Sequence, residues 1–240
     1  MEHFAEWNRF FEEYDRLKKS LSSDIIQHFT LDFNRINNGL STLLEKRNRR
    51  RKDITPEFNI YRVLKIETKE VLNHSNMLAC LLDPEGSHEQ GYLFLKAFFE
   101  AAERAQPIPL NPPDSIEGEH WIVEREKHIP SNRFLDIVLS CTRIGYIVAI
   151  ENKIRAHDQP DQMRDYQNWI SQMSRYYPGG KAIYLTPYGR DSCTASSEYD
   201  YVRLSYSDHI ISMIQSCIGQ IKSRRLRSIL DQYLEIINFL

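Results

Sequence analysis

Two acidic residues and a lysine carry most of the chemical information in this chain. Glu151 follows Asp136 by fifteen positions in the stretch FLDIVLSCTRIGYIVAIENKI, and Lys153 comes two positions after Glu151. Both acids interrupt apolar runs that are typical of neighbouring buried strands. A carboxylate taken out of water costs several kcal/mol unless a cation or hydrogen bonds compensate it, so acids on core strands indicate a function. A divalent metal ion is the simplest compensating partner.

These residue types fit a hard cation such as Mg²⁺, which prefers oxygen ligands. Asp136 and Glu151 would supply two carboxylates, and the backbone carbonyl of Asn152 is a further candidate ligand. Lys153 is expected on the same face of the strand as Glu151, because side chains two positions apart point the same way. Its ammonium would orient an attacking water or stabilise a negative transition state. The set therefore predicts metal-assisted hydrolysis of a phosphodiester, with Mn²⁺ as a substitute for Mg²⁺.

The apolar patterns predict the strands that carry these groups. Residues 121–129 alternate apolar and charged side chains, and with the two acid-bearing strands they predict a three-stranded meander. On the first strand we expect Glu124 and Glu126 on one face and Arg125 and Lys127 on the other. This strand is expected to face solvent, with one glutamate as a secondary candidate for supporting the site.

The segment after Lys153 predicts a crossover back to the same sheet. Residues 161–176 have apolar side chains at helical intervals, and 181–186 read as a short apolar strand. One more strand is expected near 201–204, followed by two helices over 208–240. Upstream of the meander, two helices are expected around the turn DPEGSH, and a proline-rich loop over 106–119 precedes the strands.

The N-terminal quarter reads as a helical arm that precedes the main domain. Its helical stripe consists of Phe4, Trp7, Phe10, Phe11, Tyr14, Leu17 and Leu21. A second helix is expected to end in the basic run at 46–52. Either this run is a solvated helix end whose charge suits the helix dipole, or Arg49, Arg50 and Arg51 contact phosphates.

Composition places the chain among folded proteins with a substantial core. It has 240 residues, 41% of them hydrophobic, and a net charge of -2, so attraction to a polyanion must come from local patches. We predict an arm over 1–55 and a domain over 56–240, with a core at about 70–205 and helices over 208–240. The four cysteines form no CxxC pair and are expected to be small core residues. A cytoplasmic location without membrane contact is predicted, because neither a signal peptide nor a spanning helix is evident.

In this pattern the chain resembles the PD-(D/E)XK nuclease superfamily, and more closely a bacterial subgroup of it. Asp136 matches the family's first acid, although Leu135 replaces the usual proline, and Glu151-Asn152-Lys153 matches the E-x-K triplet. The segment EVLNHSNMLACLLDP at 70–84 is similar to a helix of the subgroup, with cysteine where tryptophan is usual. Gln162 and Tyr166 match the Q-x-x-x-Y pair of several nucleases in this superfamily. The resemblance covers about 70–186.

The resemblance implies a restriction-endonuclease-like α/β core, in which helices flank a small mixed β-sheet, with helical N- and C-terminal extensions. It implies a Mg²⁺-dependent endonuclease acting on DNA, with RNA as the alternative substrate. Many members of the superfamily serve in antiphage defence, so a homodimer or a defence-system partner protein is expected. The rival function is a catalytically silent nuclease-fold module that binds nucleic acid or assembles with partner proteins, since a fold can outlast its chemistry.

Several matched positions have two interpretations each. In the resemblance Glu70 completes the metal site, although Glu67 is a rival and a plain surface carboxylate is the alternative. His74 and Ser75 would either orient their helix or touch the scissile phosphate, and a lone histidine favours the first role. Gln162 and Tyr166 would hold the substrate backbone or brace Lys153; alternatively, Tyr166 belongs to the core stripe of its helix.

Overall fold

The computed structural model describes residues 2–18, 23–55, 58–111 and 113–240, without the side chains of 2–5, 23–26 and 52–54. The chain divides into two compact units, Met1–Phe58 and Asn59–Leu240. The predicted boundary between 55 and 56 adjoins residues 56–57, which lie outside the described residues. Phe4 and Leu21, at the two ends of the predicted stripe, lie outside the described side chains.

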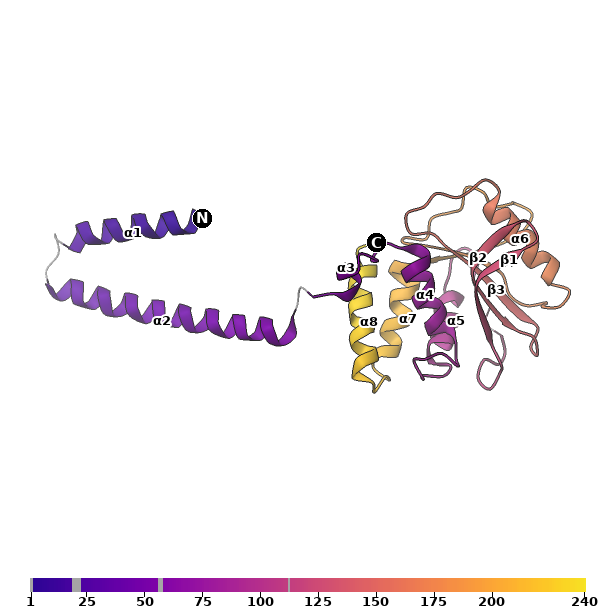
Figure 1. Ribbon diagram of the computed structural model, residues 1–240, viewed down its shortest axis with the longest axis horizontal. Helices are drawn as coiled ribbons and strands as arrows, with labels where there is room; N and C mark the ends of the chain where they lie inside the picture. Colours follow the sequence, from indigo (N-terminus) through magenta and orange to yellow (C-terminus); the bar gives the residue numbers. More distant parts are fainter. Residues whose placement is uncertain (1, 19–22, 56–57, 112) are drawn as a thin grey trace. The chain divides into compact units, whose positions relative to one another are not determined.

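The first unit consists of α1 (Glu2–Lys18) and α2 (Ser23–Ile54), drawn in indigo and violet in Figure 1. Aromatic side chains join the two helices. Phe10 stacks on Phe33 with ring centroids 5.8 Å apart, and Tyr14 stacks on Phe29 at 5.6 Å. The basic run at 46–52 lies in the last turns of α2, which ends at Ile54, as expected.

The second unit is built on a five-stranded mixed sheet with the order β1-β2-β3-β4-β5. The first three strands form the predicted antiparallel meander, and β4 and β5 add to it in parallel. The parallel return from β3 to β4 passes through helix α6 (Gln162–Met173). The strand bounds are β1 Ile122–Ile129, β2 Arg133–Cys141, β3 Tyr146–Asn152, β4 Ala182–Thr186 and β5 Val202–Ser205.

Helices cover both faces of the sheet (Figure 1). On one face α6 packs through Met163, Tyr166 and Trp169 against side chains such as Ile147 and Ala149 of β3. The opposite face carries the larger core, in which Val148 and Ile150 of β3 meet the remaining helices. Those are α4 (Asn76–Leu82), α5 (Leu93–Glu103), α7 (Ile211–Ile218) and α8 (Arg224–Ile237), with the short α3 (Ile60–Val63) and the π-helical turns η1 (Glu70–Ser75) and η2 (Tyr206–Ile210).

This arrangement confirms the predicted α/β class, with a mixed sheet between helical layers. Within the described residues no helix combines the length and apolar character needed to cross a membrane. The expectation that all four cysteines are core residues is wrong for two of them. Cys141 and Cys217 are buried, whereas Cys80 and Cys193 are exposed on a helix and a loop.

The predicted alternation of charges along β1 is also wrong, because the strand is distorted at Glu126. Its backbone φ is +47°, a value that L-residues rarely adopt. Regular pairing holds on either side, with Arg125 opposite Ile137 and Lys127 opposite Leu135. Glu124 and Lys127, expected on opposite faces, form an ion pair at 2.6 Å. The distortion therefore ends the simple pleat at the position that faces Asp136.

Candidate active site

The register of β2 and β3 brings the two predicted acids together. Ile137 pairs with Ile150, so the next position along the same antiparallel register sets Asp136 opposite Glu151. Side chains that oppose each other across two strands lie on the same face. This is the α6 face, because Ala149, two positions before Glu151, belongs to the core under α6. The sheet itself therefore creates the carboxylate pair.

Glu151 is buried, with 3% of its surface exposed. One carboxylate oxygen, Oε1, lies 2.8 Å from Lys153 Nζ and accepts a hydrogen bond of 2.8 Å from Gln162 Nε2. The other oxygen, Oε2, is buried and has no hydrogen-bond partner. Since an unpartnered buried acceptor is destabilising, Oε2 is the atom at this site that most needs a ligand.

Asp136 is half-buried and is held by the backbone of β3. Its Oδ2 accepts a hydrogen bond of 2.7 Å from the N–H of Asn152. Asn152 lies between Glu151 and Lys153 in the chain, so all three members of the triplet place a group beside the carboxylate of Asp136 or Glu151. Glu151 and Lys153 do so through their side chains, and Asn152 does so through its backbone.

Burial dominates the electrostatics of the pair. It raises the pKa of Glu151 to about 8, with the charge of Asp136 adding to the rise and Lys153 opposing it. It also raises the pKa of Asp136 to about 6, against the Asn152 N–H and Lys153. Two carboxyls this close titrate as a pair, so the raised values belong to the pair.

Lys153 stays cationic in this environment. Burial alone would lower the pKa of its ammonium, but Glu151 and Asp136 raise it above its usual range. A cationic Lys153 favours an ionised Glu151, whereas burial favours the protonated form. Because burial is the larger of the two influences on Glu151, we take its carboxyl to hold a proton near neutral pH in the metal-free protein.

The Gln162 and Tyr166 side chains fix Glu151 from α6. The Gln162 amide donates to Glu151 Oε1 and to Tyr166 Oη at 3.0 Å, and Tyr166 Oη donates to the carbonyl of Phe134 on β2 at 2.9 Å. Tyr166 is thus a core residue and also part of a brace. The brace reaches Glu151 and not Lys153, and the two side chains are buried. No hydrogen bond joins either of them to Lys153 among the described residues.

The three predicted residues of η1 lie in different places. Glu70 Oε1 accepts hydrogen bonds from the N–H groups of Arg155 and Ala156, at 3.0 and 2.8 Å, just after the triplet. Its charge also acts on Asp136, whose pKa it raises slightly. Ser75 Oγ accepts from the side-chain amide of Asn152 on the other face of the sheet. His74 is fully buried, and its ring nitrogens contact Tyr233 Oη and the carbonyl of Glu67, not the carboxylates.

The donor set fits a hard divalent ion that keeps most of its water. Asp136 and Glu151 offer carboxylate oxygens, one of them the unpartnered Oε2. Across the described residues no cluster of three or more His, Cys, Asp or Glu side chains is arranged to hold a metal. Mg²⁺ commonly binds through one or two carboxylates together with waters and substrate oxygens, so two are sufficient. The backbone carbonyl of Asn152 as a further ligand stays a prediction.

Sequence reasoning missed Asp158, which binds together the loops that follow β3 and β4 and form the rim of the site. Its carboxylate accepts hydrogen bonds from Tyr184 Oη, from Ser192 Oγ at 2.6 Å and from the Cys193 N–H at 2.9 Å. Tyr184 pairs with Glu151 across β3 and β4, so the contact links the rim to the site. Asp158 therefore ties the loop after β3 to the loop after β4. No local pattern could have predicted a contact between two loops.

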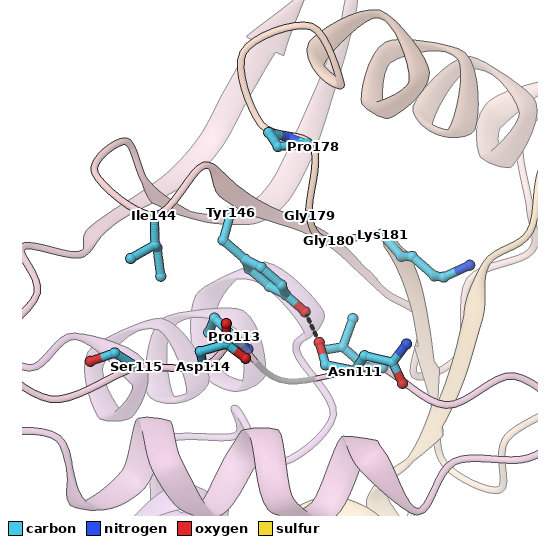
Figure 2. A pocket seen from close by; sticks show the side chains of 11 residues that line it. Asn111, Pro113, Asp114, Ser115, Ile144, Tyr146, Pro178, Gly179, Gly180 and Lys181 are labelled. Atoms are coloured by element: carbon cyan, nitrogen blue, oxygen red, sulfur yellow. Dashed lines mark hydrogen bonds between the residues drawn. The ribbon is translucent and has the colours of Figure 1, made fainter.

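A separate cavity of about 570 Å³ lies at the opposite end of β3, between the start of that strand and the loop before β4. Figure 2 shows Tyr146 inside it, with its hydroxyl donating to the carbonyl of Asn111. Asp136, Glu151 and Lys153 do not line this cavity. The carboxylate pair and the cavity therefore belong to different ends of the sheet.

Comparison with known proteins agrees with the fold. A family model described as PD-(D/E)XK nuclease superfamily matches residues 58–235, which include the whole sheet and every residue of the pair and its braces. The chain matches none of the curated proteins and none of the solved structures with which it was compared. The match extends beyond the motifs to both helical layers, and on this basis the chain belongs to the PD-(D/E)XK nuclease superfamily.

Proposed function

We propose that this protein is a divalent-metal-dependent endonuclease that hydrolyses phosphodiester bonds in DNA. The observation that carries the proposal is the buried, unpartnered Oε2 of Glu151 beside Asp136. An ion between the two carboxylates would satisfy that oxygen and draw both carboxyls into their ionised forms. Membership of a nuclease superfamily supports a hydrolytic reaction, and the resemblance described above supports DNA as the substrate.

Each residue has a defined role in this proposal. Asp136 and Glu151 would hold the ion, with the Asn152 carbonyl as a further oxygen ligand. Once bound, such an ion polarises a phosphoryl oxygen and lowers the pKa of an adjacent water. Lys153, held 2.8 Å from Glu151 Oε1, would orient the nucleophile and neutralise negative charge that develops on the phosphate. Gln162 occupies the same Oε1, which leaves Oε2 for the ion.

A plasmid-cleavage assay tests this assignment. Purified protein is incubated with supercoiled plasmid and Mg²⁺ or Mn²⁺, next to Asp136→Asn, Glu151→Gln and Lys153→Met. The matched controls are Glu117→Gln and Lys96→Met, because Glu117 and Lys96 form a similar acid–amine pair at 3.1 Å on the surface. We expect nicking by the wild type and both controls, and a loss of at least about 100-fold in the three site variants. Equal nicking by all six proteins would refute the assignment.

The Arg49, Arg50 and Arg51 side chains are proposed to contact the phosphates of DNA. The residues are exposed in α2, and three adjacent cations would release condensed counterions on binding. Replacing all three with alanine should flatten the slope of log K against log salt by about one for each lost phosphate contact. The control removes Arg224, Arg225 and Arg227, which are equally basic and exposed on α8. If the slope is unchanged, the run is a solvated helix segment. A matched RNA duplex in the same titration tests the alternative substrate.

We also propose that the N-terminal unit forms a homodimer. In α2 the apolar residues Ile36, Leu40 and Leu43 continue, at intervals of four and three, the stripe that Phe29 and Phe33 begin against α1, and this is the spacing of a coiled-coil seam. Ile36 is 70% exposed and Leu43 is 65% exposed. Light scattering should give a dimer mass that Ile36→Glu and Leu43→Glu reduce to a monomer. Leu31→Glu is the control, because Leu31 is exposed but lies outside the seam; a monomeric wild type would refute the proposal.

A role in defence against phage or foreign DNA is proposed on the resemblance alone. Cells that express the chain should show a lower efficiency of plating for a susceptible phage than cells that express Glu151→Gln. Equal plating across a broad phage panel would argue against this role but would leave the nuclease assignment unaffected, because that assignment rests on the plasmid assay.

A further inference from the structure

The side chain of Asn152 joins the carboxylate site to the helices on the other face of the sheet. Strand alternation directs it away from Glu151 and Lys153, and it is completely buried. Its Nδ2 donates to Ser75 Oγ at 3.0 Å, and its Oδ1 accepts from Tyr206 Oη at 3.2 Å. The backbone N–H of the same residue donates to Asp136. One residue thus connects both layers of the fold at the site.

Both partners of the Asn152 amide lie in π-helical turns. Ser75 is the last residue of η1 and Tyr206 is the first residue of η2. Such turns are rare in proteins overall, but those that occur are often found at functional sites, where the extra residue redirects a side chain. The first residue of η1, Glu70, holds the N–H groups of Arg155 and Ala156. The turn η1 therefore forms hydrogen bonds with Asn152 of the triplet through Ser75 and with the backbone just after the triplet through Glu70.

A buried polar cluster holds these turns in place. His74 Nε2 lies 2.9 Å from the carbonyl of Glu67, so this nitrogen carries the hydrogen, and Nδ1 then accepts from Tyr233 Oη of α8 at 3.1 Å. Burial lowers the pKa of His74, in agreement with a neutral ring. The ring also meets Tyr206 edge to face, with centroids 5.5 Å apart. The cluster is neutral and buried, and it contacts Asn152 through Tyr206.

We infer that Ser75 and Tyr206 are positioning residues that act through Asn152 on the metal-binding carboxylates, an inference that rests on the proposed function. The hydrogen bond from Asn152 to Asp136 depends on the orientation of the peptide between Glu151 and Asn152. Anchoring the Asn152 amide on the far face fixes that orientation. Without the anchor the peptide can rotate, Asp136 loses its donor, and the two carboxylates no longer present a constant geometry to an ion.

Direct Mn²⁺ binding, measured by isothermal titration calorimetry, tests this inference without relying on cleavage. Ser75→Ala and Tyr206→Phe each remove one hydroxyl and should raise the Kd for Mn²⁺ by about tenfold. Tyr146→Phe is the matched control, because Tyr146 begins β3, faces the same core and donates one hydrogen bond at the far end of the strand (Figure 2). It should lower the melting temperature as much as Tyr206→Phe but leave the Kd within twofold.

A double-mutant comparison shows whether Ser75 acts through Asn152. Asn152→Ala and the double variant Asn152→Ala/Ser75→Ala should bind Mn²⁺ with the same Kd, because the second change has no remaining route to the site. A wild-type Kd in Ser75→Ala and Tyr206→Phe, together with loss of binding in Glu151→Gln, would overturn the inference and leave the proposed function intact. Binding that survives unchanged in both Glu151→Gln and Asp136→Asn would overturn the proposed function and this inference with it.

Discussion

Affinity for a divalent ion should depend steeply on pH, because the ion must displace a proton from the carboxylate pair. Burial raises the pKa of Glu151 to about 8 and that of Asp136 to about 6, whereas a metal ligand must be ionised. Between pH 6 and pH 8 the metal-free pair therefore holds about one proton, which binding would release. Above pH 8 the pair holds none, and the affinity should level off.

The size of the effect follows from these values. Release of one proton changes the Kd by about tenfold per pH unit, so the Kd for Mn²⁺ should fall about 100-fold from pH 6 to pH 8, or about 3 kcal/mol. The stability of the metal-free protein should change in the opposite sense. The folded Glu151 carboxyl keeps a proton that the unfolded chain loses near pH 4.5, so stability should fall as pH rises from there to about 8.

Calorimetric titrations with Mn²⁺ at pH 6, 7 and 8 measure the Kd, and buffers of different ionisation enthalpy count the released protons. Glu151→Gln, which should not bind the ion, should show no proton release at any of these pH values, since an amide holds no titrating proton. The control, Glu117→Gln, removes an exposed carboxylate that is paired with Lys96 and should follow the wild type. A wild-type Kd that is constant over this range, with no proton release, would refute the idea that burial protonates the pair.

Three further predictions concern stability and are checked by urea unfolding. The pKa of Asp158 is lowered to about 2, because its hydrogen-bond donors outweigh its burial. The contribution of this carboxylate to the free energy of unfolding is therefore lost as pH falls from about 4 to about 2. Allowing for solvent screening, Asp158→Asn should cost about 1 kcal/mol at pH 7 and less at pH 3. Gly180→Ala should cost about 2 to 4 kcal/mol, because φ is +105° and an added Cβ would collide with the Ile147 carbonyl, whereas Gly91→Ala meets strain alone and should cost less. Ser223→Ala should cost about 1 kcal/mol by removing the N-cap of α8, and Ser223→Asp should restore it.

The periodic parts of the fold were predictable because their physics is local. Two apolar strands with a short turn must pair, so the meander and the shared face of Asp136 and Glu151 follow from spacing alone. The amphipathic pattern of α6 and the apolar run of β4 predict the parallel return. The family resemblance extended these local inferences to the whole sheet, and the match over 58–235 confirms it.

The features that sequence reasoning missed depend on tertiary contacts or on unusual backbone. Glu126 has a side chain that suits an ordinary strand, so nothing in its neighbourhood indicates a φ of +47°. The π-helical turns depend on an inserted residue, and helical periodicity has no separate signal for it. Asp158 finds two of its donors, Ser192 and Cys193, in a loop some 35 positions later, where short polar residues are common. Each of these features depends on residues that are distant in the sequence and close in the folded structure.

The triplet Glu151-Asn152-Lys153 illustrates why a strand end suits such a site. Alternation along β3 directs two of its side chains to the α6 face and the third to the opposite core, while its backbone donates to Asp136. The charged groups are held by α6 through Gln162 and by the backbone N–H of Asn152, whose side chain is anchored in turn by Ser75 of η1. A site built this way does not rely on the loops around it to hold its geometry. Substitutions in the distant core beneath Asn152 should therefore change metal affinity, while those in the neighbouring rim loops should mainly change stability or substrate access.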